Sequence, residues 1–130
     1  MRLILASCLS VLSLPAAAQS VNCYIATAQI ELTFCAEQDW MAADADLNAA
    51  YAAAQAAMKA VDANLPVSLR GASVALRDAQ RAWIPFRDAA CAAEGYQMRG
   101  GSAEPMVIYG CRARVTQTRA ADLWTLAEAY

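Results

Sequence analysis

The side chains that could carry out chemistry in this chain are carboxylates and cysteines, because its 130 residues include no histidine. Without imidazole there is no Ser-His or Cys-His pair and no histidine ligand for zinc or haem. If the protein were a glycan hydrolase, its two catalytic carboxylates could be Asp44 with Asp46 or Glu94 with Glu104. Residues two apart on a helix point about 200° apart, so the first pair cannot flank one glycosidic bond. We therefore expect a protein that is not an enzyme and uses no cofactor and no metal.

The cysteines have spacings typical of structural disulfides. The chain has five of them, and none forms a CxxC, CxxCH or zinc-type motif. Cys8 lies in a predicted leader, which leaves Cys23, Cys35, Cys91 and Cys111 in the rest of the chain. Four cysteines in a small exported domain indicate a disulfide framework with three connectivities, and free buried thiols are the alternative.

Residues 1–18 are typical of a secretory signal peptide. Arg2 supplies the positive charge, residues 3–14 form an apolar run, and the small residues that end at Ala18 supply a cleavage site. This run is too short to span a bilayer. Leu5-Ala6-Ser7-Cys8 also matches a lipoprotein box, but it comes so early that we favour ordinary cleavage. The prediction is one periplasmic or secreted domain of residues 19–130, with no transmembrane span after cleavage.

Acidic residues are concentrated in the first part of this domain. The whole chain has a formal net charge of −2, and residues 19–58 contain five acidic residues and no Lys or Arg. Such a chain lacks the clustered basic surface that binding to a nucleic-acid backbone requires. Glu37, Asp39 and Asp46 form a predicted acidic helix face that would suit lysozyme or another cationic protein. A face that only keeps an alanine-rich helix soluble is the simpler alternative.

The elements that must position these residues are three helices, over about residues 27–62, 66–93 and 102–128. Leu47, Tyr51, Ala54, Met58 and Val61 are spaced by four and three residues, which is typical of one apolar helix face. Short connections predict an all-α, three-helix up-down-up bundle stapled by disulfides.

The sequence also predicts where the three helices begin and which of their residues face inward. Ile30, Phe34 and Met41 extend the first apolar face upstream. The second helix begins at Pro66 and is expected to bend at the outward-facing Pro85, and Ser102 is the expected N-cap of the third. The other expected inward positions are Leu69, Leu76, Gln80, Trp83, Arg87, Cys91, Ile108, Cys111, Val115, Leu123 and Leu126.

Polar side chains interrupt the apolar faces of the first two helices. Asp44, Asn48 and Tyr51 share one face, and Gln80 and Arg87 lie one heptad apart on the other. Buried charges are tolerated only when they are paired and hydrogen-bonded. We expect an interhelical network in which Asp44 pairs with Arg87 or Arg81, and Asn48 bonds to Gln80. We favour a structural role for it over a ligand site.

Several blocks of the sequence together resemble the LprI-like family. They are DADLNAAY at 44–51, LRDAQRAWIPFRDAAC at 76–91, GGSAEPM at 100–106, and TQTR at 116–119. The resemblance spans about residues 23–126, and Pro85 departs from the family pattern. It implies a helical, disulfide-bonded periplasmic domain with lysozyme-inhibitor activity. The alternative function is a structural or envelope-stress helper domain that binds protein or peptide partners without inhibiting lysozyme.

Helix geometry selects one disulfide connectivity. Cys35 is half a turn away from the face of Asp44, so it points outward, where the segment around Cys23 can fold back onto it. Cys91 faces inward at the end of the second helix, close to the start of the third helix and Cys111. We therefore expect the pairs Cys23–Cys35 and Cys91–Cys111.

The glycine-containing loop over residues 94–104 is a second candidate binding surface. Tyr96, Arg99 and Glu104 combine an aromatic ring, a cation and an acid on a segment that the Cys91–Cys111 bond would clamp. Protruding loops often carry recognition, and a clamped loop loses little entropy on binding. The alternative is that this loop only turns the chain into the third helix.

Overall fold

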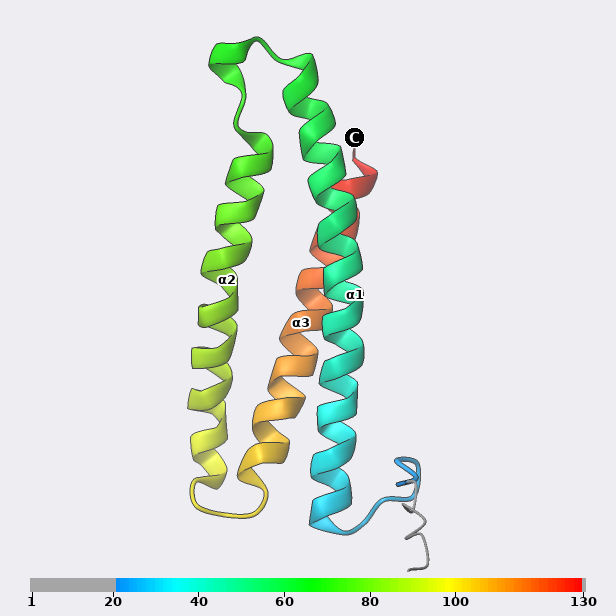
Figure 1. The fold of residues 1–130 in the computed structure, drawn as a ribbon. Helices are drawn as coiled ribbons and strands as arrows, with labels where there is room; N and C mark the ends of the chain where they lie inside the picture. The colour runs from blue at the N-terminus through cyan, green and yellow to red at the C-terminus, as the bar shows by residue number, and fades with distance from the viewer. Residues whose placement is uncertain (1–20, 130) are drawn as a thin grey trace, which may run out of the picture.

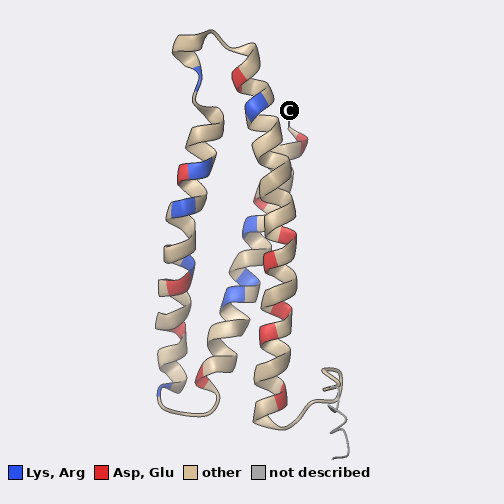
Figure 2. Ribbon diagram, viewed as in Figure 1, with Lys and Arg blue, Asp and Glu red and all other residues tan. Residues whose placement is uncertain are grey.

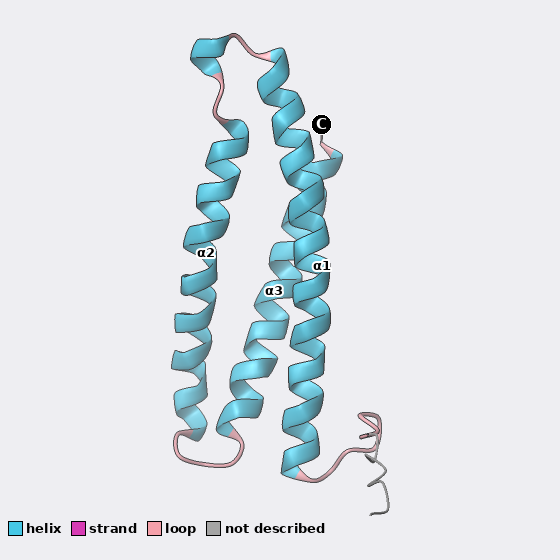
Figure 3. Cartoon of the chain, in the orientation of Figure 1, coloured by secondary structure: helices cyan, strands magenta, loops and turns pink. Residues whose placement is uncertain are grey.

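The computed structural model describes residues 21–129 and folds them into three long helices (Figure 1). Helix α1 spans Gln29–Asn64, α2 spans Ala72–Gly95 and α3 spans Glu104–Glu128. Two 3-10 turns, η1 (Val67–Leu69) and η2 (Tyr96–Met98), lie in the connections. The described part of the chain contains no strand (Figure 3). These helices run up, down and up, which confirms the predicted all-α bundle; the predicted leader at 1–18 lies outside the described residues.

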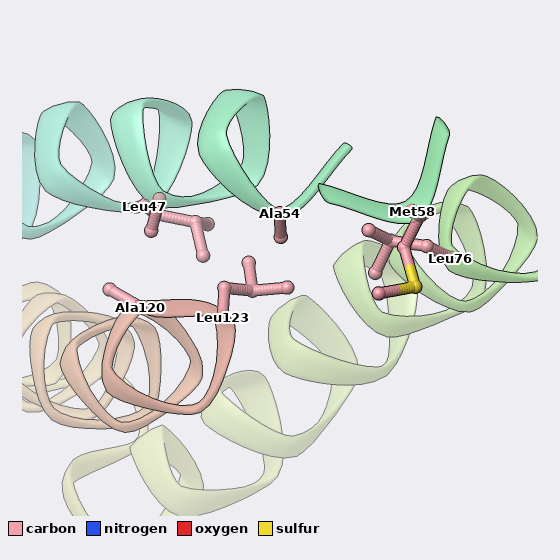
Figure 4. Packing of buried hydrophobic residues seen from close by; sticks show 7 residues of the cluster. Leu47, Ala54, Met58, Leu76, Ala120 and Leu123 are labelled. Atoms are coloured by element: carbon pink, nitrogen blue, oxygen red, sulfur yellow. The ribbon is translucent and has the colours of Figure 1, made fainter. Parts of the chain in front are cut away.

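Small and apolar side chains form the core between the helices. Leu47, Ala50, Ala54 and Met58 of α1 pack with Ala120 and Leu123 of α3 and with Leu76 of α2 (Figure 4). The most extensive packing is between α1 and α3, where alanines at the contact let the two backbones approach closely. No helix among residues 21–129 has the length and apolarity needed to cross a membrane.

The expected upstream extension of the apolar face of α1 is wrong. Ile30, Phe34 and Met41 are exposed, with 81% of Ile30 and 57% of Met41 accessible. These three residues share a side of the helix, but that side is about 100–140° from Leu47. The core face instead continues upstream through Ala43, which is buried, and Trp40, which is half-buried.

Helix α2 begins at Ala72 rather than at the predicted Pro66, because Asp62 caps its first turn. The Asp62 carboxylate accepts hydrogen bonds from the backbone N–H groups of Gly71, Ala72 and Ser73 at 2.8–3.0 Å and from the Ser73 hydroxyl at 2.8 Å. Pro66 only precedes the short turn η1. Leu69, expected inside, is exposed there, since it lies outside both helices.

Helices α2 and α3 approach each other closely near the turn that joins them. Gly95 is buried, and a Cβ atom at this position would lie 2.5 Å from Cγ1 of Ile108, so only glycine lets the two helices approach there. The predicted N-cap at Ser102 is wrong, because α3 begins at Glu104 after Ala103. Helix α2 continues through Pro85, which is exposed.

Two disulfides join the chain where the sequence predicted them. Cys23–Cys35 ties the segment before α1 to that helix, and Cys91–Cys111 ties the end of α2 to the first half of α3. Cys91 and Cys111 are both buried, whereas Cys23 is exposed. The predicted connectivity is confirmed.

Candidate functional site

Arg87 is the centre of a buried polar cluster between the helices. Only 8% of its side chain is accessible, and its guanidinium lies over the rings of Trp40 and Trp83 at 5.5 and 5.2 Å from their centroids. Its Nη1 lies 3.3 Å from Asp44 Oδ1, and its Nε lies 3.0 Å from Asp88 Oδ1. Two carboxylates and two aromatic faces thus compensate the loss of water around this charge.

Helix α3 contributes the other side of this cluster. Arg112 places its guanidinium 4.8 Å from the Trp40 ring centroid, and its Nε lies 3.3 Å from Asp88 Oδ1. Tyr109 of α3 stacks with Trp40, and the two ring centroids are 5.6 Å apart. Trp40, Asp88 and Arg112 were not predicted as members of this cluster, although Trp40 precedes Asp44 by four residues, as Trp83 precedes Arg87. Such i, i+4 spacing puts each Trp beside a charged residue.

The rest of the expected network is connected differently. Asp44 pairs with Arg87 rather than Arg81, which is exposed and forms no ion pair with the residues described. The expected bond between Asn48 and Gln80 is wrong. Asn48 donates to Asp44 Oδ2 at 3.3 Å, and Gln80 Oε1 accepts from Arg119 Nε at 3.1 Å, because α3 lies within reach of Gln80.

A groove runs between α1 and α2 and consists of two neighbouring hollows, of about 590 and 350 Å³, which share Tyr51 and Arg77. We call this trough the α1–α2 groove. Its side of α1 runs from Asp44 to Lys59, and its side of α2 runs from Ser73 to Arg87. A third hollow, of about 270 Å³, adjoins the groove at Asp44 and Asn48 but is lined by α1 residues alone.

The turn that joins α2 to α3 holds a compact set of interactions. Arg99 Nη1 lies 2.7 Å from Glu104 Oε1, and the backbone N–H of Gly100 donates to Glu104 Oε2 at 2.8 Å. Gly100 has a φ of 78°, which glycine adopts without strain. The N–H bond from Gly100, followed by the bond from Arg99, lowers the pKa of the Glu104 carboxyl. Its bond to Glu104 raises the pKa of Arg99.

These interactions decide which side chains the turn presents. Arg99 lies over the Tyr96 ring at 4.8 Å from its centroid, and 64% of the Arg99 side chain is accessible, against 16% of Glu104. Tyr96 and Met98 are exposed. We call residues 96–103 the α2–α3 loop. It presents Tyr96, Met98 and Arg99, whereas Glu104 is turned back to hold it.

The predicted acidic face of α1 is divided between two sides of the helix. Asp39 and Asp46, seven residues apart, lie on one side, but Glu37 is about 160° from Asp39. The prediction of one face containing all three is therefore wrong. Asp46 also accepts a hydrogen bond from Trp124 Nε1 at 3.0 Å. Acidic residues nevertheless dominate the first half of α1, whereas α2 and α3 each carry basic and acidic residues in equal number (Figure 2).

Glu94 and Glu104, the second acidic pair considered for hydrolysis, each form an ion pair with an arginine. Glu94 accepts from Arg114 Nη2 at 2.8 Å, and Glu104 is bound by Arg99. Within residues 21–129 no three cysteine or acidic side chains are grouped in a way that could hold a metal ion.

Comparison with known proteins places this architecture in a family. The sequence matches the family described as lysozyme inhibitor LprI over residues 22–123, which includes both disulfides and all three helices except the last few residues of α3. The chain belongs to the LprI family. An uncharacterized protein of Rhizobium meliloti (strain 1021) is 46% identical over 110 residues, which are 82% of this chain and 79% of that protein. No solved structure matches the sequence.

Membership in the LprI family assigns the chain to a group named for inhibition rather than for catalysis. The match covers the Arg87 cluster, the α1–α2 groove and the α2–α3 loop together. The family match therefore does not indicate which of these three regions binds a partner. The geometry of each region is the remaining guide.

Proposed function

We propose that this chain is an exported protein that binds lysozyme and inhibits it, without catalysing a reaction itself. The observation that carries the proposal is the match to lysozyme inhibitor LprI across residues 22–123. Two disulfides support export, since such bonds persist in oxidising compartments. The pattern of residues 1–18, typical of a signal peptide, supports it as well.

The α2–α3 loop is the surface that we propose for contact with the enzyme. Glycosidases such as lysozyme cleave their substrate between two carboxyl groups in a cleft, so an inhibitor needs a convex element to enter it. The loop forms one end of the bundle (Figure 1) and presents Tyr96 and Arg99. Arg99 supplies a cation for the carboxylates of the cleft, and Tyr96 supplies apolar area.

The loop is suited to this contact because it is already ordered. The Cys91–Cys111 bond closes its base, and Glu104 bonds to both Arg99 and the Gly100 N–H. A segment held in one conformation loses less entropy when it binds. Asp39 and Asp46 lie elsewhere, on α1, where we propose that they attract the cationic surface of lysozyme at longer range.

An inhibition assay with loop variants tests this proposal. The chain from Gln19 onward is titrated into c-type and g-type lysozymes, and the lytic rate on a peptidoglycan suspension is measured. We expect the unaltered chain to slow at least one enzyme. Tyr96→Ala and Arg99→Ala should each raise the inhibition constant about 10-fold or more, as truncation of central contact residues does.

The matched control is Gln97→Ala, because Gln97 is exposed in the same loop and makes no side-chain hydrogen bond to the residues described. This variant should inhibit within twofold of the unaltered chain. Asp39→Asn with Asp46→Asn should weaken inhibition at low salt only, since screening removes long-range attraction. Unchanged lysis at a large excess of the unaltered chain would overturn the proposed function.

A further inference from the structure

The α1–α2 groove carries an excess of positive charge. Its largest hollow is lined by three arginines, Arg77, Arg81 and Arg87, against one acid, Asp44. Arg87 and Asp44 neutralise each other at 3.3 Å. Arg77 bonds only to its exposed neighbour Asp78, and Arg81 forms no ion pair with the residues described. Arg81 therefore remains available on the α2 side of this trough, and Arg77 is exposed there but already paired.

A large apolar side chain lies beside these cations on α2. Arg77, Arg81 and Ile84 lie at positions i, i+4 and i+7, so they share one face of α2. Across the groove, α1 presents Tyr51 and Asn48. Ile84 is partly exposed, although it is a large apolar side chain, and so is Met41 in the adjoining hollow. A ligand that fits must therefore offer negative charge and apolar surface at neighbouring positions.

The length of the groove indicates the size of that ligand. Its α1 side runs from Asp44 to Lys59 and its α2 side from Ser73 to Arg87, and a helix rises 1.5 Å per residue, so the trough is about 22 Å long. An extended peptide covers that distance with about seven residues. Lys59 adds a third cation at the far end of the trough, with no acid lining that hollow.

We propose that the α1–α2 groove is a second binding site, which takes a peptide segment of a partner protein that carries both acidic and apolar side chains. Carboxylates of the segment contact Arg77 and Arg81, and its apolar side chains contact Ile84 and Tyr51. This site is distinct from the α2–α3 loop, which is at the end of the bundle. The concave α1–α2 groove can receive a protruding segment of a partner, whereas the convex α2–α3 loop can enter the cleft of an enzyme. The two surfaces therefore serve different partners.

Fluorescence anisotropy tests this site. A fluorescein-labelled eight-residue peptide of alternating Glu and Leu is titrated with the chain from Gln19 onward, alongside the same peptide with Lys for Glu and a labelled 12-nucleotide oligothymidylate. We expect saturable binding of the Glu-Leu peptide alone, weakened by raising NaCl from 50 to 500 mM. Equal binding of the oligothymidylate would contradict the proposal, because it would indicate a general polyanion surface.

Variants separate the groove from other cations of the molecule. Arg77→Gln with Arg81→Gln should weaken peptide binding about 10-fold or more, and Ile84→Ser should weaken it several-fold. The control Arg114→Gln removes an exposed arginine of α3 outside the groove and should change affinity less than twofold. Far-ultraviolet circular dichroism checks that each variant remains helical.

The lysozyme assay distinguishes failure of this site from failure of the proposed function. The double variant Arg77→Gln, Arg81→Gln should inhibit lysozyme as well as the unaltered chain does. Peptide binding that the double variant leaves intact would overturn the groove site, and so would no binding at millimolar peptide. Either result leaves the inhibition test unaffected.

Discussion

At the scale of single residues, Arg87 shows how a helical bundle with a small core holds a buried charge. Its guanidinium lies over two tryptophan rings and contacts Asp44 and Asp88. Lysine would not replace it, because a compact ammonium cannot lie flat against the rings and bond to both carboxylates at once. We therefore assign Arg87 the structural role of fixing α1 against α2.

Substitution of Arg87 should be strongly destabilising. Arg87→Ala should lower the free energy of unfolding by about 3–5 kcal/mol, because it breaks a buried ion pair and leaves a void between two rings. Asp44→Ala should cost less, since Asp44 is more exposed and Asp88 still pairs with the arginine. Urea titration followed by circular dichroism measures both. A loss below 1 kcal/mol for Arg87→Ala would contradict this role.

Asp62 should make stability depend on pH on the acid side. Hydrogen bonds from the N–H groups of Gly71, Ser73 and Ala72 hold the pKa of its carboxyl well below the usual range. The folded pKa lies below the unfolded value of about 3.9, so the stabilisation is complete above that value. It is lost progressively as the pH falls further.

Asp62→Asn tests this dependence. At pH 7 the variant should melt about 4–8 °C below the unaltered chain, as loss of a helix cap does in a small domain. The difference should shrink below pH 4, where Asp62 becomes protonated in the unfolded chain while it stays ionised in the folded one. Asp122→Asn, an exposed change on α3, is the control and should leave the melting temperature within 1–2 °C. A difference that stays constant from pH 7 to pH 2 would contradict the assignment.

At the scale of elements, the positions of the three helices were predicted well from the sequence. Which residues of each helix face the core was predicted less well. The four-three spacing from Leu47 to Val61 identified the core face of α1, but upstream of it the same periodicity selected the wrong side. Ile30, Phe34 and Met41 agree in phase with one another and not with Leu47. Where the true core residue is an alanine, as at Ala43, hydrophobic size gives no signal.

The orientation of α3 about its own axis could not be predicted from the sequence, and so the contacts of its side chains could not be predicted either. The pair Asp44–Arg87 joins the two helices whose polar faces were recognised, and it was among the two pairings considered. Arg112 and Arg119 reach the same region from α3, and nothing in their local spacing relates them to Asp88 or Gln80. For the same reason the expected bond from Asn48 to Gln80 failed.

The Cys91–Cys111 disulfide should stabilise the α2–α3 connection. The two cysteines are 20 residues apart, and a bond across such a loop contributes about 3 kcal/mol by restricting the unfolded chain. Cys91→Ala with Cys111→Ala should lower the free energy of unfolding by that amount in urea titrations. Cys23→Ala with Cys35→Ala is the comparison and should cost less, because that bond closes a shorter loop onto an exposed segment. Equal or reversed losses would contradict this assignment.

At the scale of the whole molecule, the bundle separates its surfaces. The α2–α3 loop lies at one end, the α1–α2 groove lies along the side, and acidic residues dominate the first half of α1 (Figure 2). The cysteine pair at the base of the loop was predicted from the sequence, whereas Tyr96 and Arg99 as contact residues stay a prediction. The groove was not predicted, since only the packing of α1 against α2 brings Arg77 and Arg81 opposite Tyr51 and Asn48.

Amide hydrogen exchange tests most directly whether the α2–α3 loop contacts lysozyme. Exchange of the chain is measured alone and with a molar excess of the lysozyme that it inhibits. We predict slower exchange at residues 96–104 in the complex and unchanged exchange along the α1–α2 groove. Protection confined to α1, or no protection at any residue, would contradict the proposed contact.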